Sequence, residues 1–303
     1  MISTSSPKVN LETTRSTLDS QRQAARPAPS VQVRFTSRLA QLPWWALAIG
    51  LGGLVMIYNF TTNAVYGEVL ANIVAGIKLT ILVSVSAYAI AIVLGLVTSL
   101  GQLSKNPFAR NAALLYVQVV RGIPILVQIF TVAFVVVPLA IQAINALGQT
   151  LIAAGILASD NFLANLNIRN VDFVARGIIA LAISYGAFSS EIFRAGIQSI
   201  ERGQIEAAQS IGLSYFQSLR LVILPQAIRR VLPPLGNDFI AMLKESSLVS
   251  AIGVGEITQL SKKYAAASFK FPETYFTLAF VYLSMTLVLS MVVRFMERRL
   301  KSG

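Results

Sequence analysis

A short polar segment interrupts the long apolar stretches in the second half of this chain. Residues 203–227 read GQIEAAQSIGLSYFQSLRLVILPQA. Residues 203–211 favour a helix, because glutamine, glutamate and alanine all have high helix propensity. Gly212 would end that helix, since glycine accepts the left-handed conformation common after a helix end. Ser214 would cap a second helix, and Pro225 would begin the next apolar one. The segment therefore predicts two short helices joined by a tight turn.

Composition places this segment in a membrane protein. Of the 303 residues, 55% are hydrophobic and only 13% are charged, whereas soluble domains average about 25% charged residues. The net charge is +12, but the basic residues stand at the edges of apolar stretches, unlike the basic face of a nucleic-acid-binding protein. We therefore expect an all-α polytopic membrane protein that binds no nucleic acid.

The residue types that the sequence lacks exclude several classes of function. It contains no histidine and no cysteine, which removes the usual general base and the usual metal ligands. It also has no GxxxxGK[ST] loop, so it does not bind ATP in the P-loop manner. An intramembrane enzyme is disfavoured, because the nucleophile–base pairs of such chemistry are missing. We expect no catalytic residue, no metal site and no cofactor on this chain.

Six segments are apolar enough to cross a bilayer, whose core of about 30 Å requires roughly 20 helical residues. They are 44–62, 74–102, 112–140, 174–198, 222–244 and 273–297. With six crossings, the clusters of lysine and arginine all fall on one side, which the positive-inside rule makes cytoplasmic. Both termini are then expected in the cytoplasm.

Two of the stretches outside these segments lead to separate expectations. Residues 1–43 are polar and basic and predict a disordered cytoplasmic tail, although their composition also resembles an organelle transit peptide. No secretory signal peptide is expected there. Residues 141–173 would form an external loop with an amphipathic helix against the membrane interface. A further crossing at this point would export the polar segment, against the charge rule.

The polar segment resembles the EAA loop of ABC importer permeases, through which a membrane subunit takes up force from a separate ATPase. The match is carried by Gly203, Glu206, Ala207, Ala208, Gly212, Leu224 and Pro225. Glu-Ala-Ala alone is common in any helix, but the longer spacing to the glycine and the proline is rarer. The alternative is an ordinary cytoplasmic connection of helix-forming composition.

Further motifs narrow the resemblance to permeases of the polar amino acid type, which take up histidine, glutamine or glutamate. These motifs are RGIP at 121–124, EIFRAGIQSIERGQIEAA at 191–208, LPPLGN at 232–237 and KESSLVS at 244–250. Ile123 stands where the family signature has threonine, and Glu245-Ser246 stands where members usually carry Asp-Thr or Glu-Thr. The resemblance covers roughly residues 66–138 and 174–300.

The resemblance implies a type I ABC importer permease with a core of five helices at 66–300. Residues 44–62 would be an extra N-terminal helix, 141–173 an insertion and 199–223 the cytoplasmic coupling loop. Two permease subunits, identical or different, would pair in a bacterial inner membrane. Two ATPase subunits holding ATP and Mg²⁺ would dock beneath, and a periplasmic or lipid-anchored binding protein would deliver an amino acid from outside.

Polar residues inside the expected spans are candidates for the substrate pathway, because charges in a bilayer are costly. They are Arg121, Tyr185, Ser190, Glu191 and Asn237. Glu191 would meet a substrate ammonium, or simply pair with Arg194 on the same helix face. Asn237 follows two prolines and a glycine, which are expected to break the helix at a transport site. Its amide would otherwise join two helices. Arg121 would meet a substrate carboxylate or anchor its helix end.

Two rival functions remain on the sequence alone. The first keeps the ABC permease and changes the cargo to an opine, an osmolyte or a small peptide. The second is a secondary transporter or channel that works without an ATPase. Such a protein would need carboxylates inside the membrane for ion coupling. Glu191 alone gives only weak support to that second function.

Overall fold

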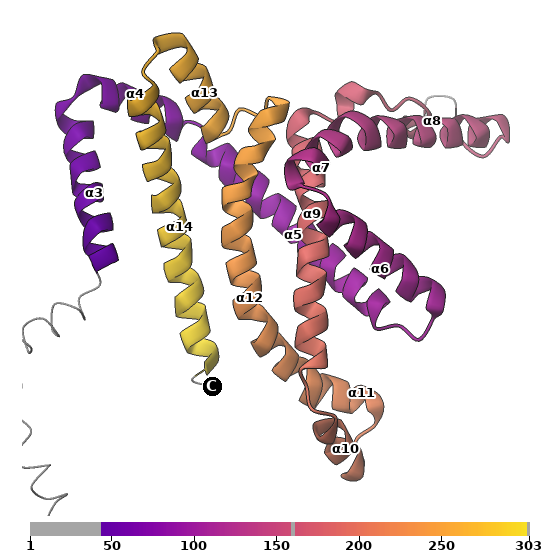
Figure 1. The fold of residues 1–303 in the computed structure, drawn as a ribbon. Coiled ribbons are helices and arrows are strands. Elements are labelled where there is room, and N and C mark those ends of the chain that lie inside the picture. The colour runs from indigo at the N-terminus through magenta and orange to yellow at the C-terminus, as the bar shows by residue number, and fades with distance from the viewer. Residues whose placement is uncertain (1–43, 159–160, 302–303) are drawn as a thin grey trace, which may run out of the picture. The chain divides into compact units, whose positions relative to one another are not determined.

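The structure is a computed structural model that describes residues 44–158 and 161–301, and within these ranges every regular element is a helix (Figure 1). The tail expected at residues 1–43 lies outside the described residues. The chain divides into two units, residues 1–55 and 56–303. The first described helix, α3, spans Trp44–Thr62 and passes from one unit into the other.

The remaining helices belong to the second unit. In chain order they are α4 (Ala64–Val74), α5 (Ile77–Gln102), α6 (Pro107–Gly122), α7 (Ile125–Thr131), the π-helical turn η1 (Val132–Val136), α8 (Val137–Ala153), the 3-10 turns η2 (Phe162–Ala164) and η3 (Ile168–Asn170), α9 (Phe173–Gln198), α10 (Arg202–Ser210), α11 (Tyr215–Ser218), the π-helical turn η4 (Leu219–Ile223), α12 (Leu224–Glu245), the 3-10 helix η5 (Ser246–Ile252), α13 (Ile257–Ser268) and α14 (Phe271–Lys301).

The centre of the second unit is the pair α5 and α9, which α12 and α14 extend to one side (Figure 1). Small residues allow the two backbones to approach closely, as is common between membrane helices. A Cβ on Gly95 of α5 would lie only 2.9 Å from the Cβ of Ser189 on α9. A Cβ on Gly186 would lie 2.8 Å from the Leu94 side chain. This close packing brings the hydroxyl groups of α9 directly against α5.

Five helical stretches are long and apolar enough to cross a membrane: 44–62, 64–102, 125–153, 173–198 and 271–299. The sixth expected span, at 222–244, corresponds to α12, which is long enough but too polar to meet that criterion. Its two arginines, lysine, aspartate and glutamate keep its mean hydropathy low. The expectation of about six membrane helices therefore rests on α12 being stabilised by its neighbours.

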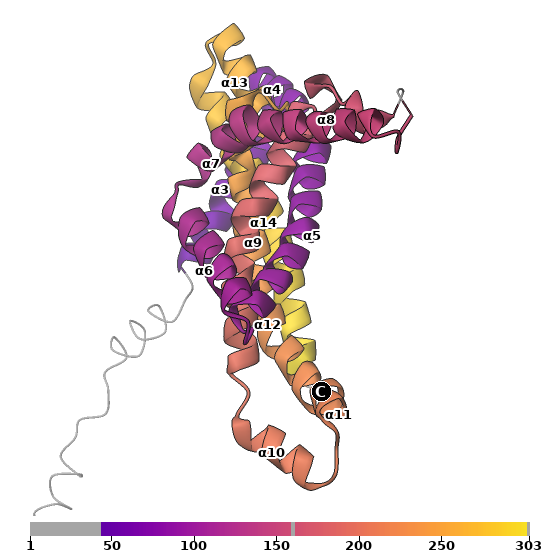
Figure 2. The same ribbon diagram turned by 90° about the vertical axis from the view of Figure 1, so that its right-hand side faces the viewer.

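The expected span at 112–140 has the wrong bounds. Helix α6 ends at Gly122, Ile123 is extended, and α7 starts after Pro124. Proline restricts the preceding residue to extended backbone, which explains the interruption at this point. The helical run that begins at Ile125 continues to Ala153, well into the loop expected at 141–173. Its last part, α8, lies across the direction of α9 in both views (Figures 1 and 2).

The expected break in the helix before Asn237 is also absent. Helix α12 continues through Pro233 and Pro234 without interruption. A proline inside a helix removes one hydrogen bond and crowds the preceding turn, but α12 packs along both α9 and α14, which hold it in place.

Candidate functional site

Three hydroxyl groups on α5 and α9 meet polar groups of α12 inside the bundle. Tyr185 Oη donates to Glu245 Oε2 at 2.9 Å, and Ser189 Oγ donates to Asp238 Oδ2 at 2.9 Å. Tyr88 Oη donates to the carbonyl of Leu235 at 2.5 Å. The three hydroxyl-bearing residues are almost completely buried. These bonds satisfy two carboxylates that would otherwise be costly inside a membrane.

Asp238 is a functional candidate that the sequence analysis missed. The adjacent Asn237, which was expected to contribute, is exposed on α12, whereas Asp238 turns toward Ser189. The signal was present in the sequence, because an aspartate within an otherwise crossing helix is itself a costly intramembrane charge.

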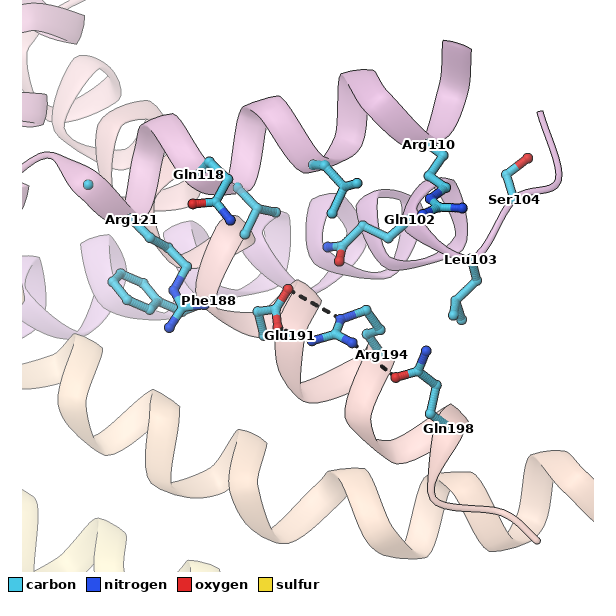
Figure 3. A pocket seen from close by; sticks show the side chains of 13 residues that line it. Gln102, Leu103, Ser104, Arg110, Gln118, Arg121, Phe188, Glu191, Arg194 and Gln198 are labelled. Atoms are coloured by element: carbon cyan, nitrogen blue, oxygen red, sulfur yellow. Dashed lines mark hydrogen bonds and ion pairs between the residues drawn. The ribbon is translucent and has the colours of Figure 1, made fainter. Parts of the chain in front are cut away.

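The ends of α5 and α9 and the length of α6 line a polar pocket of about 820 Å³ that is open on one side (Figure 3). Its polar lining residues are Gln102, Ser104, Arg110, Gln118, Arg121, Glu191, Arg194 and Gln198. The pocket thus combines two of the expected pathway residues, Arg121 and Glu191, with charged and amide side chains that were not singled out. A pocket of this size is typical of small-molecule sites.

Glu191 forms a salt bridge with Arg194 three residues along the same helix. The distance from Arg194 Nη2 to Glu191 Oε2 is 2.5 Å, and Arg194 Nη1 also donates to Gln198 Oε1 at 3.0 Å. The ion pair with Arg194, which was the alternative to substrate binding by Glu191, is therefore formed in this conformation. Arg121 approaches from α6, where its guanidinium lies 5.7 Å from the centre of the Phe188 ring.

Ser190 lies one residue from this salt bridge and is fully buried. Its hydroxyl donates to the carbonyl of Ala187 at 2.7 Å and accepts a bond from Gln102 Nε2 at 3.2 Å. Ser190 therefore fixes the orientation of the Gln102 amide instead of facing the pocket itself. Tyr185 likewise is committed to Glu245. Of the five expected pathway residues, the structure brings Arg121 and Glu191 together in the pocket, whereas Tyr185, Ser190 and Asn237 do not line it.

The polar segment of the sequence forms the two short helices α10 and α11, which project beyond the ends of α9 and α12 (Figure 2). We call residues 202–223 the elbow. Gly212 follows the first helix with φ +85°, the expected left-handed conformation. The Ser214 hydroxyl accepts a bond from the Gln217 N–H, so the expected cap of the second helix is confirmed. Helix α12 begins at Leu224 with Pro225 in its first turn, also as expected.

The residues of the elbow differ in exposure. Gly203, Glu206 and Ala207 are exposed, whereas Ala208 is only 4% exposed. The Ala208 carbonyl also accepts the bond from Leu213 N that closes the turn. The exposed residues are therefore available to a partner, and Ala208 packs inside the elbow.

Two contacts join α9 to α12 where the elbow begins and ends. Ile200, Ile223 and Ala227 form a small buried apolar cluster where α9 leads into the elbow and α12 leaves it. The Arg230 guanidinium donates to the carbonyl of Ser199 at the end of α9. Ile223 is the one of these residues that belongs to the elbow, and the others lie beside it on α12 or after α9.

A model of the family described as the binding-protein-dependent transport system inner membrane component matches residues 91–302. The chain belongs to this family. As a member of it, the chain is a multi-pass inner-membrane transport component and not a member of an enzyme family, and the resemblance to ABC importer permeases is confirmed.

Curated relatives cover most of this permease. It is 34% identical over 229 residues to the glutamine transport system permease protein GlnP of Escherichia coli strain K12, an alignment of 76% of this chain and 93% of that protein. It is 32% identical over 227 residues to the probable amino-acid permease protein YxeN of Bacillus subtilis strain 168, covering 75% and 90%.

Solved structures agree with these relatives. An amino acid ABC transporter crystallised with histidines matches with a TM-score of 0.62 and 32% identity, covering 79% of this chain and 98% of that chain. The inward-facing methionine ABC transporter MetNI matches with a TM-score of 0.53 at 16% identity and shares the fold alone. The permease therefore has the all-α fold of type I ABC importer membrane subunits, as expected.

Proposed function

We propose that this permease forms the translocation pathway of an ATP-driven importer for polar amino acids. The relatives named above include permeases for glutamine and amino acids, and the structural match with 32% identity is an amino acid transporter. The single observation that carries the proposal is the elbow. Its two short helices, ended by a glycine at φ +85°, leave Glu206 and Ala207 exposed beyond the bundle, where a separate ATPase would dock.

The proposal implies a set of partners. Two ATPase subunits would bind ATP and Mg²⁺, a second permease subunit, identical or different, would complete the pathway, and a substrate-binding protein would deliver cargo from outside. ATP binding and hydrolysis would shift the population between inward-facing and outward-facing states. The elbow would transmit that shift because its last residue, Ile223, packs with Ile200 and Ala227 between the end of α9 and the start of α12.

The substrate would pass the pocket between α5, α6 and α9. Arg121 and Glu191 offer opposite charges to a zwitterion. Tyr185 and Ser189, on the same helix as Glu191, donate to Glu245 and Asp238 of α12. Tyr185 and Ser190 would shape this wall, and Asn237 would face the second subunit or the lipid.

Uptake by the reconstituted permease tests this function. The permease, its ATPase and its binding protein are placed in proteoliposomes, and labelled amino acids are offered on the side of the binding protein. We expect uptake that requires hydrolysable ATP and that stops when the ATPase is omitted. Uptake of equal rate without the ATPase would instead indicate a secondary transporter.

Topology is tested separately in this cysteine-free chain. We propose that both termini are cytoplasmic and that residues 141–173 lie outside. Single cysteines at Ser16, Gln149 and Ser302 are probed in intact cells with an impermeant thiol reagent. Only Gln149→Cys should react, and labelling of Ser302→Cys from outside would contradict the orientation.

A further inference from the structure

Helix α13 ends on a phenylalanine in a conformation that usually requires glycine. Phe269 has φ +57° and ψ 18°, and its N–H donates to the carbonyl of Ala265 at 2.9 Å, which closes the helix end. Among the residues that the structure describes, it is the one other than glycine with a positive φ. A bulky side chain is strained in this region, and glycine is the common residue at such helix ends. The phenylalanine at this position therefore opposes the preference of the backbone.

Packing within the chain does not compensate for this strain. Phe269 is 77% exposed. Its ring lies 6.4 Å from that of Phe271, centre to centre, and the Phe271 ring stacks on that of Tyr275 at 6.5 Å. Phe271 and Tyr275 are exposed as well, and we call these three residues the aromatic tip. Strained backbone persists where surrounding contacts hold it in place, so the contacts that compensate at Phe269 are expected outside the chain.

The aromatic tip begins where the exposed apolar surface of α14 ends. Exposed apolar side chains follow α14 from Phe276 to Met296, within the stretch 271–299 that is apolar enough to cross a membrane. At 1.5 Å per residue, these two residues are about 30 Å apart, which is the thickness of a bilayer core. Phe271 lies about 8 Å further along the helix, at the depth of the lipid headgroups. The tip is therefore continuous with the membrane-facing surface of α14, at the end opposite the C-terminus (Figure 1).

Lysines beside the tip supply the charge that a lipid phosphate attracts. Lys263 on α13 and Lys270 within the tip are both exposed, and neither forms a salt bridge among the described residues. The carboxylates that act on α13 here are those of Glu68 and Glu273, and with Lys262 the lysines outnumber them. Aromatic rings at the end of a membrane span are typical of the membrane–water interface, where long lysine side chains reach the headgroups. The tip therefore has the chemistry of a lipid-binding surface.

We propose that the aromatic tip binds the headgroup layer of the leaflet at this end of α14. The Phe269 ring lies between headgroups, and Lys263 and Lys270 bind lipid phosphates. Lipid contact compensates for the strain at Phe269 and holds the turn between α13 and α14 at the membrane surface. This inference goes beyond the proposed function and does not depend on which solute is carried. A protein that docks on this side, such as the proposed binding protein, is the other occupant that the experiments distinguish.

Quenching by brominated lipid tests the position of the ring. The chain has two tryptophans, Trp44 and Trp45, and replacing both by phenylalanine removes its tryptophan fluorescence. Phe269→Trp in this full-length background is placed in nanodiscs of phosphatidylcholine whose chains are brominated near the glycerol. We expect its fluorescence to fall at least twofold relative to unbrominated lipid. The control is Ile211→Trp on the elbow, where Ile211 is highly exposed, and its fluorescence should not change.

Two results would overturn the inference. The first is equal fluorescence of Phe269→Trp in brominated and unbrominated lipid. The second is protection of this tryptophan from aqueous iodide only after the binding protein is added, because the tip would then be a surface for a protein.

Anionic lipid tests the lysines. Brominated phosphatidylglycerol and brominated phosphatidylcholine are compared at the same fraction of the nanodisc, and we expect the anionic lipid to quench Phe269→Trp at least twofold more. Lys263→Gln combined with Lys270→Gln should remove this difference. Lys105→Gln, at an exposed lysine between α5 and α6, is the matched control and should preserve it. Equal quenching by the two lipids when all lysines are present would overturn the assignment of the phosphates.

Phe269→Asn separates lipid contact from backbone strain. Asparagine tolerates the left-handed conformation better than phenylalanine does, so on strain alone this variant would be more stable. It also replaces the ring by a polar side chain, and little contact within the chain is lost because Phe269 is so exposed. We expect a lower Tm than that of the unchanged permease in phosphatidylcholine nanodiscs. A higher Tm would show that lipid does not compensate for the strain and would overturn the proposal.

Discussion

Ser189 on α9 donates a hydrogen bond of 2.9 Å to Asp238 on α12. Together with the bond from Tyr185 to Glu245, it joins the two helices through carboxylates that lie within the bundle. An ionised group inside a membrane is stable only where it finds partners. These hydroxyl groups therefore hold α12, which is too polar to qualify as a span by hydropathy, against α9.

The first prediction concerns Asp238. The variant Asp238→Asn keeps an oxygen that accepts the Ser189 bond and removes the charge. We expect normal insertion and ATPase binding, with uptake reduced at least tenfold if the charge acts in transport. Asn237→Ala, at the exposed neighbouring residue, is the matched control and should retain nearly full uptake. Membrane abundance and uptake are measured for both.

The opposite outcome, in which Asp238→Asn keeps full uptake, would also identify what this residue contributes. Full uptake in Asp238→Asn would mean that the hydrogen bond alone matters at this position. Ser189→Ala would then be the damaging change, because it leaves the buried carboxylate without its donor.

The second prediction concerns the turn of the elbow. Gly212 has φ +85°, where a β-branched side chain is strained by about 1–3 kcal/mol. We expect Gly212→Val to reach the membrane at normal levels and to lose uptake and co-purification with the ATPase. Gly212→Asn should retain both, since asparagine tolerates this conformation better.

A matched control distinguishes the effect of backbone strain from the loss of coupling to the ATPase. Gly155 also has a positive φ, +71°, and lies after α8 at a distance along the chain from the elbow. Gly155→Val introduces similar strain and should leave ATPase binding intact. Normal uptake by Gly212→Val would show that the elbow is only a connection between α9 and α12.

The third prediction compares two adjacent alanines. Ala207 is exposed on the elbow, and Ala208 is 4% exposed. We expect Ala207→Glu to weaken ATPase binding while the elbow stays folded, because it adds bulk and charge to a contact surface. Ala208→Glu buries a charge inside the elbow and should unfold it locally. Limited proteolysis at the elbow distinguishes them, and equal protease sensitivity would contradict the separate roles.

Much of this fold is predictable from local patterns. The elbow follows from helix propensity, a glycine and a proline in fixed order, and the structure has Gly212, Ser214 and Pro225 in the expected conformations. The break at 122–124 changed the bounds of one span, because its Gly-Ile-Pro sequence ends α6 inside an apolar stretch. Apolar length alone does not show where such a stretch turns.

The pocket was less predictable, because it depends on which residues of separate helices meet. Arg121 and Glu191 were found as charges in apolar helices. Gln102 was not, since a single glutamine at a helix end carries no pattern, and its bond to the Ser190 hydroxyl depends on how α5 packs against α9. Asp238 was missed beside Asn237 although its charge was visible in the sequence; what the sequence could not show is that Ser189 of α9 is its partner.

The last prediction concerns Glu256, which caps α13 outside the membrane-spanning segments. Its side chain is fully buried; Oε1 accepts a bond from Gln259 N at 2.9 Å and Oε2 accepts one from Tyr282 Oη at 3.0 Å. Burial raises the pKa of this carboxyl above its ordinary value, and the hydrogen bonds from Thr258, Gln259 and Tyr282 only partly oppose that shift. The folded permease therefore binds this proton more tightly than the unfolded chain does.

Stability should consequently depend on pH through Glu256. Because the folded-state pKa is raised, the contribution is fully present below the ordinary pKa of 4.5 and is lost as the pH rises through the raised value. Glu256→Gln, which keeps an acceptor for the Gln259 N–H, should flatten this dependence when Tm is measured in nanodiscs from pH 4 to pH 8. Glu256→Leu leaves both donors without an acceptor and should cost about 1–3 kcal/mol at every pH. An unchanged pH profile in Glu256→Gln would show that Glu256 binds its proton equally in both states, and the cap of α13 would then act through its hydrogen bonds alone.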